Sequence, residues 1–194
     1  MEIVAAALFS CDILMLISFQ VLNRDAPQFA HAISDYGVGK KTAGLFKAYV
    51  IAGALAAPLL AWQFWQAQSP SYPASVPFYL MLVALGRLGL GLFPNDPRGA
   101  VRTQTGQIHH AATLLAFTCA FMAVAEATPL LAASVADFPA SLLSGLKHLI
   151  SLGFIAVTLT ISAPLRRFFG IAERLFLYAT ALWFLTASLT LPPL

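Results

Sequence analysis

Six long apolar stretches dominate this sequence and limit what the chain can fold into. A helix needs about 20 consecutive, mostly apolar residues to cross the hydrocarbon core of a bilayer. The stretches that meet this requirement run over residues 3–22, 46–65, 76–93, 110–132, 142–163 and 172–191. They predict an all-α fold, a six-helix transmembrane bundle that forms a single integral membrane domain over residues 1–194.

Proline marks the breaks between these stretches. Proline cannot continue a helix and biases the residue before it away from helical geometry. The breaks contain Pro27, Pro70, Pro73, Pro94, Pro97, Pro139 and Pro164. The first stretch has only Glu2 before it and lacks a basic start, so we expect a retained helix rather than a cleaved signal peptide.

Composition supports the membrane environment and excludes other classes of chain. Hydrophobic residues make up 59% of the sequence and charged residues 10%, against about 25% charged in a soluble domain. This excludes a soluble globule, and the chain is far too apolar to be disordered. The net charge of +3 does not indicate nucleic acid, because the basic residues flank apolar segments. Cys11 and Cys119 lie within apolar stretches, so we expect buried packing residues rather than a disulfide.

Lysine and arginine gather in alternate loops. The first, third and fifth loops and their borders hold ten of the eleven basic residues, while the second loop has none. Loops rich in Lys and Arg stay on the cytoplasmic side of a membrane. The pattern therefore predicts a multi-pass membrane protein with loops one, three and five in the cytoplasm and both termini on the outer side.

The first and third loops also contain most of the polar residues that could bind a ligand or take part in a reaction. In an up-down bundle these two loops share one membrane face. The candidate ligand-binding residues on that face are His31, Ser34, Asp35, Lys40, Lys41, Asp96, His109 and His110. Four of them, His31, Asp35, Asp96 and His109, are side chains that could hold a divalent metal, since zinc favours imidazole and carboxylate ligands.

Simpler roles compete with a binding site in these loops. Asp35 or Ser34 could cap the second helix, and Asp96 could make a turn before Pro97. Adjacent histidines on a helix point about 100° apart, so His109 and the next residue cannot both face one centre. Lys40 and Lys41 follow a glycine-rich segment that fits an anionic lipid headgroup but fails the phosphate-loop pattern, and they could simply set topology.

Ionisable residues inside the predicted spans form a second set of candidates. Placing such residues in a bilayer costs free energy, so they need polar or charged partners. The set consists of Asp12, Arg87, Glu126 and His148. Asp12 lies midway along the first span and could meet His148 or Lys147 if the first and fifth helices touch. Arg87 is expected to point toward the third loop or to pair with Asp96, and Glu126 and His148 to lie nearer the outer ends.

Two short motifs resemble a known family. Ala32–Gly37 reads Ala-Ile-Ser-Asp-Tyr-Gly and is followed by Leu45 and Phe46; it is similar to the I-S-D-x-G signature of a six-helix superfamily. That superfamily, Frag/DRAM/Sfk, includes the damage-regulated autophagy modulators and a factor that remodels GPI-anchor lipids. Gly91–Asp96, with Gly106–His110 after it, resembles the bacterial branch catalogued as domain of unknown function 998.

The resemblance implies a six-helix bundle in the cytoplasmic membrane of a bacterium and points toward lipid handling. Its motif positions fall on Ser34, Asp35, Gly37, Phe93, Pro94, Asp96 and, for the histidine, His109. In the eukaryotic relatives the motif loop is usually drawn on the lumenal side. The charge pattern here places it in the cytoplasm instead.

Three functions are compatible with these residues. The first is binding or processing of a lipid headgroup at an interfacial site made by loops one and three. If the protein is an enzyme, metal- or histidine-assisted hydrolysis or transfer on lipid is the simplest chemistry. The second is a non-catalytic subunit with a membrane-protein partner or a second copy, and the third is a small transporter that uses Asp12. Neither a catalytic residue nor a required cofactor is predicted.

Overall fold

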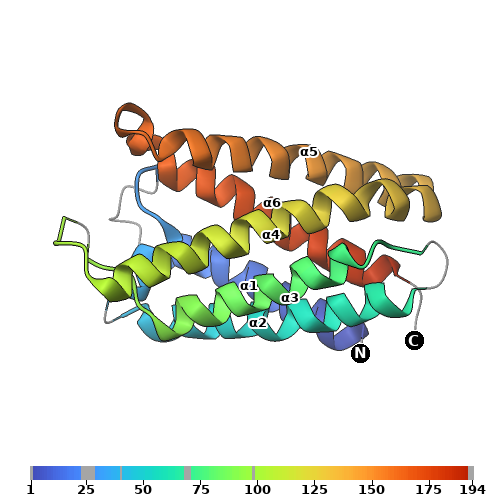
Figure 1. Ribbon diagram of the computed structural model, residues 1–194, viewed down its shortest axis with the longest axis horizontal. Helices are drawn as coiled ribbons and strands as arrows, with labels where there is room; N and C mark the ends of the chain where they lie inside the picture. The colour runs from blue at the N-terminus through green and yellow to red at the C-terminus, as the bar shows by residue number, and fades with distance from the viewer. Residues whose placement is uncertain (1, 23–28, 40, 68–70, 98, 192–194) are drawn as a thin grey trace.

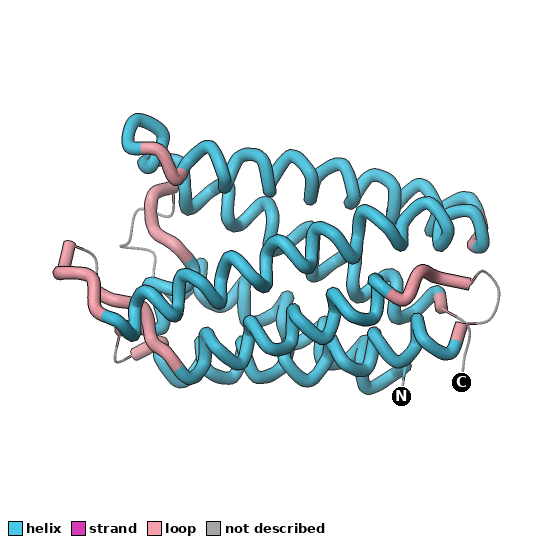
Figure 2. Tube along the Cα trace, in the orientation of Figure 1, coloured by secondary structure: helices cyan, strands magenta, loops and turns pink. Residues whose placement is uncertain are grey.

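The computed structural model shows six membrane-length helices that run up and down along one long axis (Figure 1). It describes residues 2–22, 29–39, 41–67, 71–97 and 99–191. The helices are α1 (Glu2–Leu22), α2 (Ala43–Gln66), α3 (Ser75–Leu92), α4 (Gln104–Ser134), α5 (Asp137–Thr160) and α6 (Phe169–Thr190). All six are long and apolar enough to cross a membrane, and the described residues contain no strand (Figure 2). The predicted all-α six-helix fold is therefore confirmed.

The helices pack as a ring in which each contacts the next, and α1 closes the ring against α6. Helix α6 also contacts α2 and α4, which places it deepest in the bundle, and its Trp183 is fully buried. Helix α5 is the most peripheral, with large apolar side chains such as Leu152 and Leu159 exposed. In a bilayer these outward side chains face lipid, so the sides of the bundle need no charged residues.

Two short 3-10 helices lie at the end of the bundle where α2 and α6 begin. They are η1 (Ile33–Gly37) and η2 (Ala163–Phe168). The connections between α1 and α2, α3 and α4, and α5 and α6 all lie at this end, which we call the loop end (Figure 1). Both termini lie at the opposite end. Ile33 and Tyr36 bury η1 against Phe19 and Phe46, so this segment is part of the core.

Several helix ends differ from those predicted from apolar length. Helix α4 begins at Gln104 because the Thr103 hydroxyl accepts a hydrogen bond from the Gly106 amide and caps the helix. Helix α5 begins at Asp137, ahead of Pro139, because a proline in the first turn removes no helical hydrogen bond. These extensions matter for function, since they place His109 within α4 and move His148 toward the middle of α5.

The cysteines are both free, and one of them lies differently from the prediction. Cys119 is buried as expected, whereas Cys11 is exposed on the outside of the bundle. The small thiol of Cys11 therefore faces the lipid instead of filling the core.

Candidate functional site

The first and third loops meet at the loop end, as the up-down arrangement predicted. The Asn95 side-chain amide donates hydrogen bonds to the Ser34 hydroxyl at 3.2 Å and to Asp35 Oδ1 at 3.4 Å. Asn95 also accepts a hydrogen bond from the Asp96 amide at 3.0 Å. Asn95 was not among the predicted site residues, although it is the residue that joins the two loops.

Asp35 belongs to η1 and stabilises that short helix. Its Oδ2 atom accepts a hydrogen bond from the Ala32 amide at 3.1 Å and lies 3.4 Å from His31 Nδ1. The prediction that Asp35 or Ser34 caps the second helix is wrong. Helix α2 begins after Thr42, whose hydroxyl donates instead to the Tyr36 carbonyl at 2.6 Å.

Asp96 binds the residue that begins α4. Its carboxylate accepts hydrogen bonds from the Thr103 hydroxyl at 2.7 Å and from the Thr103 amide at 2.9 Å. These two bonds, the hydroxyl bond first, hold the pKa of Asp96 below its usual value. A Cβ atom at position 106 would collide with the carboxylate, so Gly106 is needed for this approach. Asp96 does not form the predicted ion pair with Arg87, whose partner is Asp12. The predicted turn at Pro97 involves Arg98, which lies outside the described residues.

The adjacent histidines separate as their helical positions require. His109 is buried, and its Nδ1 atom donates to the Phe93 carbonyl at 2.7 Å. Its Nε2 atom has no hydrogen-bond partner among the described residues. His110 is exposed. No group of three or more His, Cys, Asp or Glu residues in the described part of the chain could hold a metal ion, so the geometry does not support the predicted metal set.

Two residues of α6 hold η1 in place across the bundle. Glu173 Oε2 accepts a hydrogen bond from the Ile33 amide at 2.6 Å. Arg174 donates to the His31 carbonyl at 2.7 Å and to the Tyr36 hydroxyl at 2.9 Å. Sequence reasoning counted Arg174 only as a topology signal and did not consider Glu173. Two adjacent residues of opposite charge inside an apolar span were the sequence signal that could have identified this pair.

Basic side chains also lie at the loop end. Among the described residues, the exposed ones are Lys41, Lys47, Arg102, Arg166 and Arg167. None of them forms an ion pair with the described acidic residues. Lys40, another predicted ligand, lies outside the described residues.

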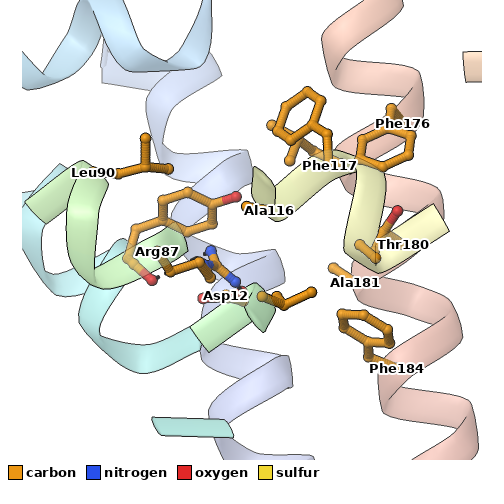
Figure 3. Close-up of a pocket in the computed structure, with 13 residues that line it drawn as sticks. Asp12, Arg87, Leu90, Ala116, Phe117, Phe176, Thr180, Ala181 and Phe184 are labelled. Carbon is orange, nitrogen blue, oxygen red and sulfur yellow. Dashed lines mark hydrogen bonds and ion pairs between the residues drawn. The ribbon is translucent and has the colours of Figure 1, made fainter. Parts of the chain in front are cut away.

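A second polar group lies inside the bundle. Asp12 of α1 and Arg87 of α3 form a buried ion pair with 2.5 Å between Oδ2 and the guanidinium nitrogen (Figure 3). The guanidinium also lies over the Tyr49 ring, 4.4 Å from its centroid. A Cβ atom at position 53 would overlap the guanidinium, so Gly53 provides the room for Arg87.

This pair corrects two predictions. Asp12 does not meet His148 or Lys147, because α1 and α5 are not in contact. Arg87 turns into the bundle rather than toward the third loop, since a partner of opposite charge lies at its own depth.

The remaining two intramembrane candidates have separate environments. Glu126 accepts a hydrogen bond from the Ser75 hydroxyl and so joins α4 to the start of α3. His148 is exposed on the outer face of α5, eleven residues from the first residue of that helix and twelve from the last. It therefore lies near mid-span and not near the outer end of its helix.

Six spanning helices, with a buried ion pair between them and polar loops at one end, define a multi-pass integral membrane protein. The family model described as "Protein of unknown function (DUF998)" matches residues 3–190, so the chain belongs to this family. Comparison with curated proteins and with solved structures found no match. The wider relationship to the eukaryotic superfamily stays a prediction.

Proposed function

We propose that the protein binds the anionic headgroup of a membrane lipid at the loop end of the bundle. The observation that supports this proposal is that five basic side chains are exposed in the described part of that end: Lys41, Lys47, Arg102, Arg166 and Arg167. None has an acidic partner among the described residues. Each Lys or Arg near an anionic membrane surface contributes about 1 kcal/mol of attraction.

The described acidic residues at the loop end form no ion pair with these lysines and arginines. Asp35 and Asp96 accept hydrogen bonds from their own loops, and Glu173 is buried under η1. The carboxylates thus shape the loops, while the basic groups remain available at the surface. Asn95 joins the first loop to the third, and these two loops lead to Lys41 and Arg102 respectively.

In the proposed orientation, the basic residues of the loop end face anionic lipids. With the basic loops in the cytoplasm, the loop end faces the leaflet whose anionic lipids give a negative surface potential. A phosphate group there would meet the basic side chains at the height of the headgroups. The termini would then lie on the outer side of a bacterial cytoplasmic membrane.

Native mass spectrometry of the protein released from mixed phosphatidylglycerol and phosphatidylcholine nanodiscs tests the lipid proposal. We expect retained phosphatidylglycerol, and we expect a variant with Lys41→Gln, Arg102→Gln and Arg166→Gln to lose that preference. Lys147→Gln on α5 is the matched control, because it removes a basic charge away from the loop end. Equal retention of both lipids by the unaltered protein would contradict the proposal and leave the basic residues as topology signals.

A second candidate function, a subunit of a membrane complex, is favoured by the outer face of α5. His148 is exposed near mid-span, and Gly145 and Ser141 lie on the same face one and two turns before it. A Cβ atom at Gly145 would meet nothing within 4 Å. Polar residues in a span normally face protein, and small residues let two helices approach closely. This face therefore suits a helix of another membrane protein or of a second copy.

Purification in a mild detergent tests the subunit proposal through the mass of the recovered assembly. We expect a partner at fixed stoichiometry that is lost in Gly145→Leu, because the added side chain blocks close approach. Ala48→Leu adds similar bulk to an exposed position on α2 and should leave the assembly intact. A single chain recovered from gentle extraction, without any partner, would count against this function.

A further inference from the structure

A cavity lies beside the Asp12–Arg87 ion pair in the middle of the bundle (Figure 3). Its walls come from α1, α2, α3, α4 and α6, and its volume is about 50 Å³. Phe117, Phe176 and Phe184 supply much of the apolar lining. Figure 3 shows Asp12 and Arg87 on one side of the cavity and Thr180 of α6 on the other.

Two buried polar atoms in the cavity wall have no hydrogen-bond partner among the described residues. They are Asp12 Oδ1 and Thr180 Oγ1. Asp12 is 2% exposed and Thr180 is 7% exposed, so bulk water does not reach either atom. A buried polar atom without a partner costs about 1–3 kcal/mol. Both atoms therefore indicate a bound molecule that completes their hydrogen bonds.

Thr180 differs from other hydroxyl residues of its own helix. The Thr186 hydroxyl donates to the Leu182 carbonyl at 2.8 Å, and the Ser188 hydroxyl donates to the Leu185 carbonyl at 2.8 Å. Such bonds within the helix are the usual way to satisfy a hydroxyl in a membrane span. The Thr180 hydroxyl makes no such bond and remains free to bind a ligand in the cavity.

The charges around the cavity indicate an uncharged ligand. The Asp12 carboxylate and the Arg87 guanidinium neutralise one another. An ion placed beside them would have no counter-charge in a low-dielectric environment, which is strongly unfavourable. A neutral molecule avoids this cost, and it must carry at least one N–H or O–H because Asp12 Oδ1 can only accept.

The size of the cavity sets the size of the molecule. One water needs about 10–15 Å³ of such a cavity, so the space accommodates three or four water-sized groups. We propose that the cavity binds a small uncharged molecule that donates a hydrogen bond to Asp12 Oδ1 and shares one with the Thr180 hydroxyl. Water and short alcohols or amides of at most about four non-hydrogen atoms have this chemistry. The site is independent of the lipid site at the loop end.

Methyl NMR of the full-length protein in nanodiscs tests the proposal, with the Ala116 methyl group in the cavity wall as the reporter. Without additive, we expect a nuclear Overhauser contact between water and this methyl group. We expect acetamide to shift the Ala116 signal saturably and to remove the water contact. Acetone has a similar size and lacks an N–H donor, so it should produce no saturable shift. A water contact that persists without any acetamide shift identifies water as the occupant.

Three variants complete the experiment. Thr180→Val keeps the shape and removes the hydroxyl, so acetamide binding should weaken by about three- to ten-fold, the effect of one hydrogen bond. Thr186→Val is the control on the same helix and should bind as the unaltered protein does. Ala120→Leu fills the cavity and should abolish both signals. The proposal is overturned if neither water nor acetamide contacts Ala116, if acetone acts like acetamide, or if Thr180→Val changes nothing.

Discussion

The Asp12–Arg87 pair shows how a single glycine can decide whether a buried charge finds its partner. Arg87 reaches Asp12 by lying across Gly53, where any side chain would occupy the place of the guanidinium. Apolar length predicted the depth of Asp12 in the bundle. The identity of its partner could not be predicted, because depth alone does not say which helices are neighbours.

We expect Gly53→Ala to displace the guanidinium and lower the free energy of unfolding by about 2–4 kcal/mol, because breaking a buried ion pair outweighs the helix propensity gained. Gly44→Ala is the matched control, since a Cβ atom there meets nothing within 4 Å. It should raise stability by about 0.5–1 kcal/mol. Thermal unfolding of both variants in one detergent measures the difference. Equal stability would show that Arg87 does not depend on the space at Gly53.

Asp96 supports a prediction about pH at the same scale. Hydrogen bonds from Thr103 lower the pKa of this carboxyl group in the folded protein. A lowered folded-state pKa adds stability that is fully present above the ordinary value of 3.8 and is lost as pH falls through the lowered value. We expect Thr103→Val to raise the pKa of Asp96 toward 3.8, as measured by carbon NMR of the carboxyl group. Thr105→Val should leave the titration unchanged, and an unchanged pKa in Thr103→Val would contradict the assignment.

The helices were predictable from apolar length, whereas their ends and the 3-10 helix η1 were not. Pro139 looked like a break but lies in the first turn of α5, and Thr103 lengthens α4 by its cap. The loop containing Ile33 is polar in sequence, yet the Ile33 amide donates a long-range hydrogen bond to Glu173 that holds the loop against the core. Local patterns carry no information about contacts between residues this far apart in the chain.

Helix η1 should loosen when its anchor on α6 is weakened. In Arg174→Lys, a single ammonium group takes the place of a planar guanidinium that has several donors. The bonds to His31 and Tyr36 therefore cannot all be kept. The loss of one charged hydrogen bond, about 1.5–3 kcal/mol, predicts roughly 10- to 100-fold faster amide exchange in η1. Arg167→Lys is the control, because Arg167 is exposed. If amide exchange in η1 were unchanged in both variants, Arg174 would not be the residue that holds η1 in place.

At the scale of the whole molecule, the three basic connections lie at one end and the termini at the other (Figure 1). This arrangement makes the proposed orientation testable at two exposed positions. In a background without native cysteines, Ala74→Cys lies at the end of the termini and Ala100→Cys at the loop end. A membrane-impermeant maleimide should label position 74 in intact cells and position 100 only after lysis. The reverse pattern would place the loop end outside.

The bonds from Glu173 and Arg174 also have a consequence for how the protein is made. The first loop leaves the ribosome early, but its anchors lie in the last helix, 140 residues after Ile33. Until α6 has entered the membrane, the first loop lacks its bonds to Glu173 and Arg174 and is held only by earlier parts of the chain such as Asn95. A chain truncated before α6 would lack both anchors of η1, so the proposed lipid site would take its final shape only after the last helix has been inserted.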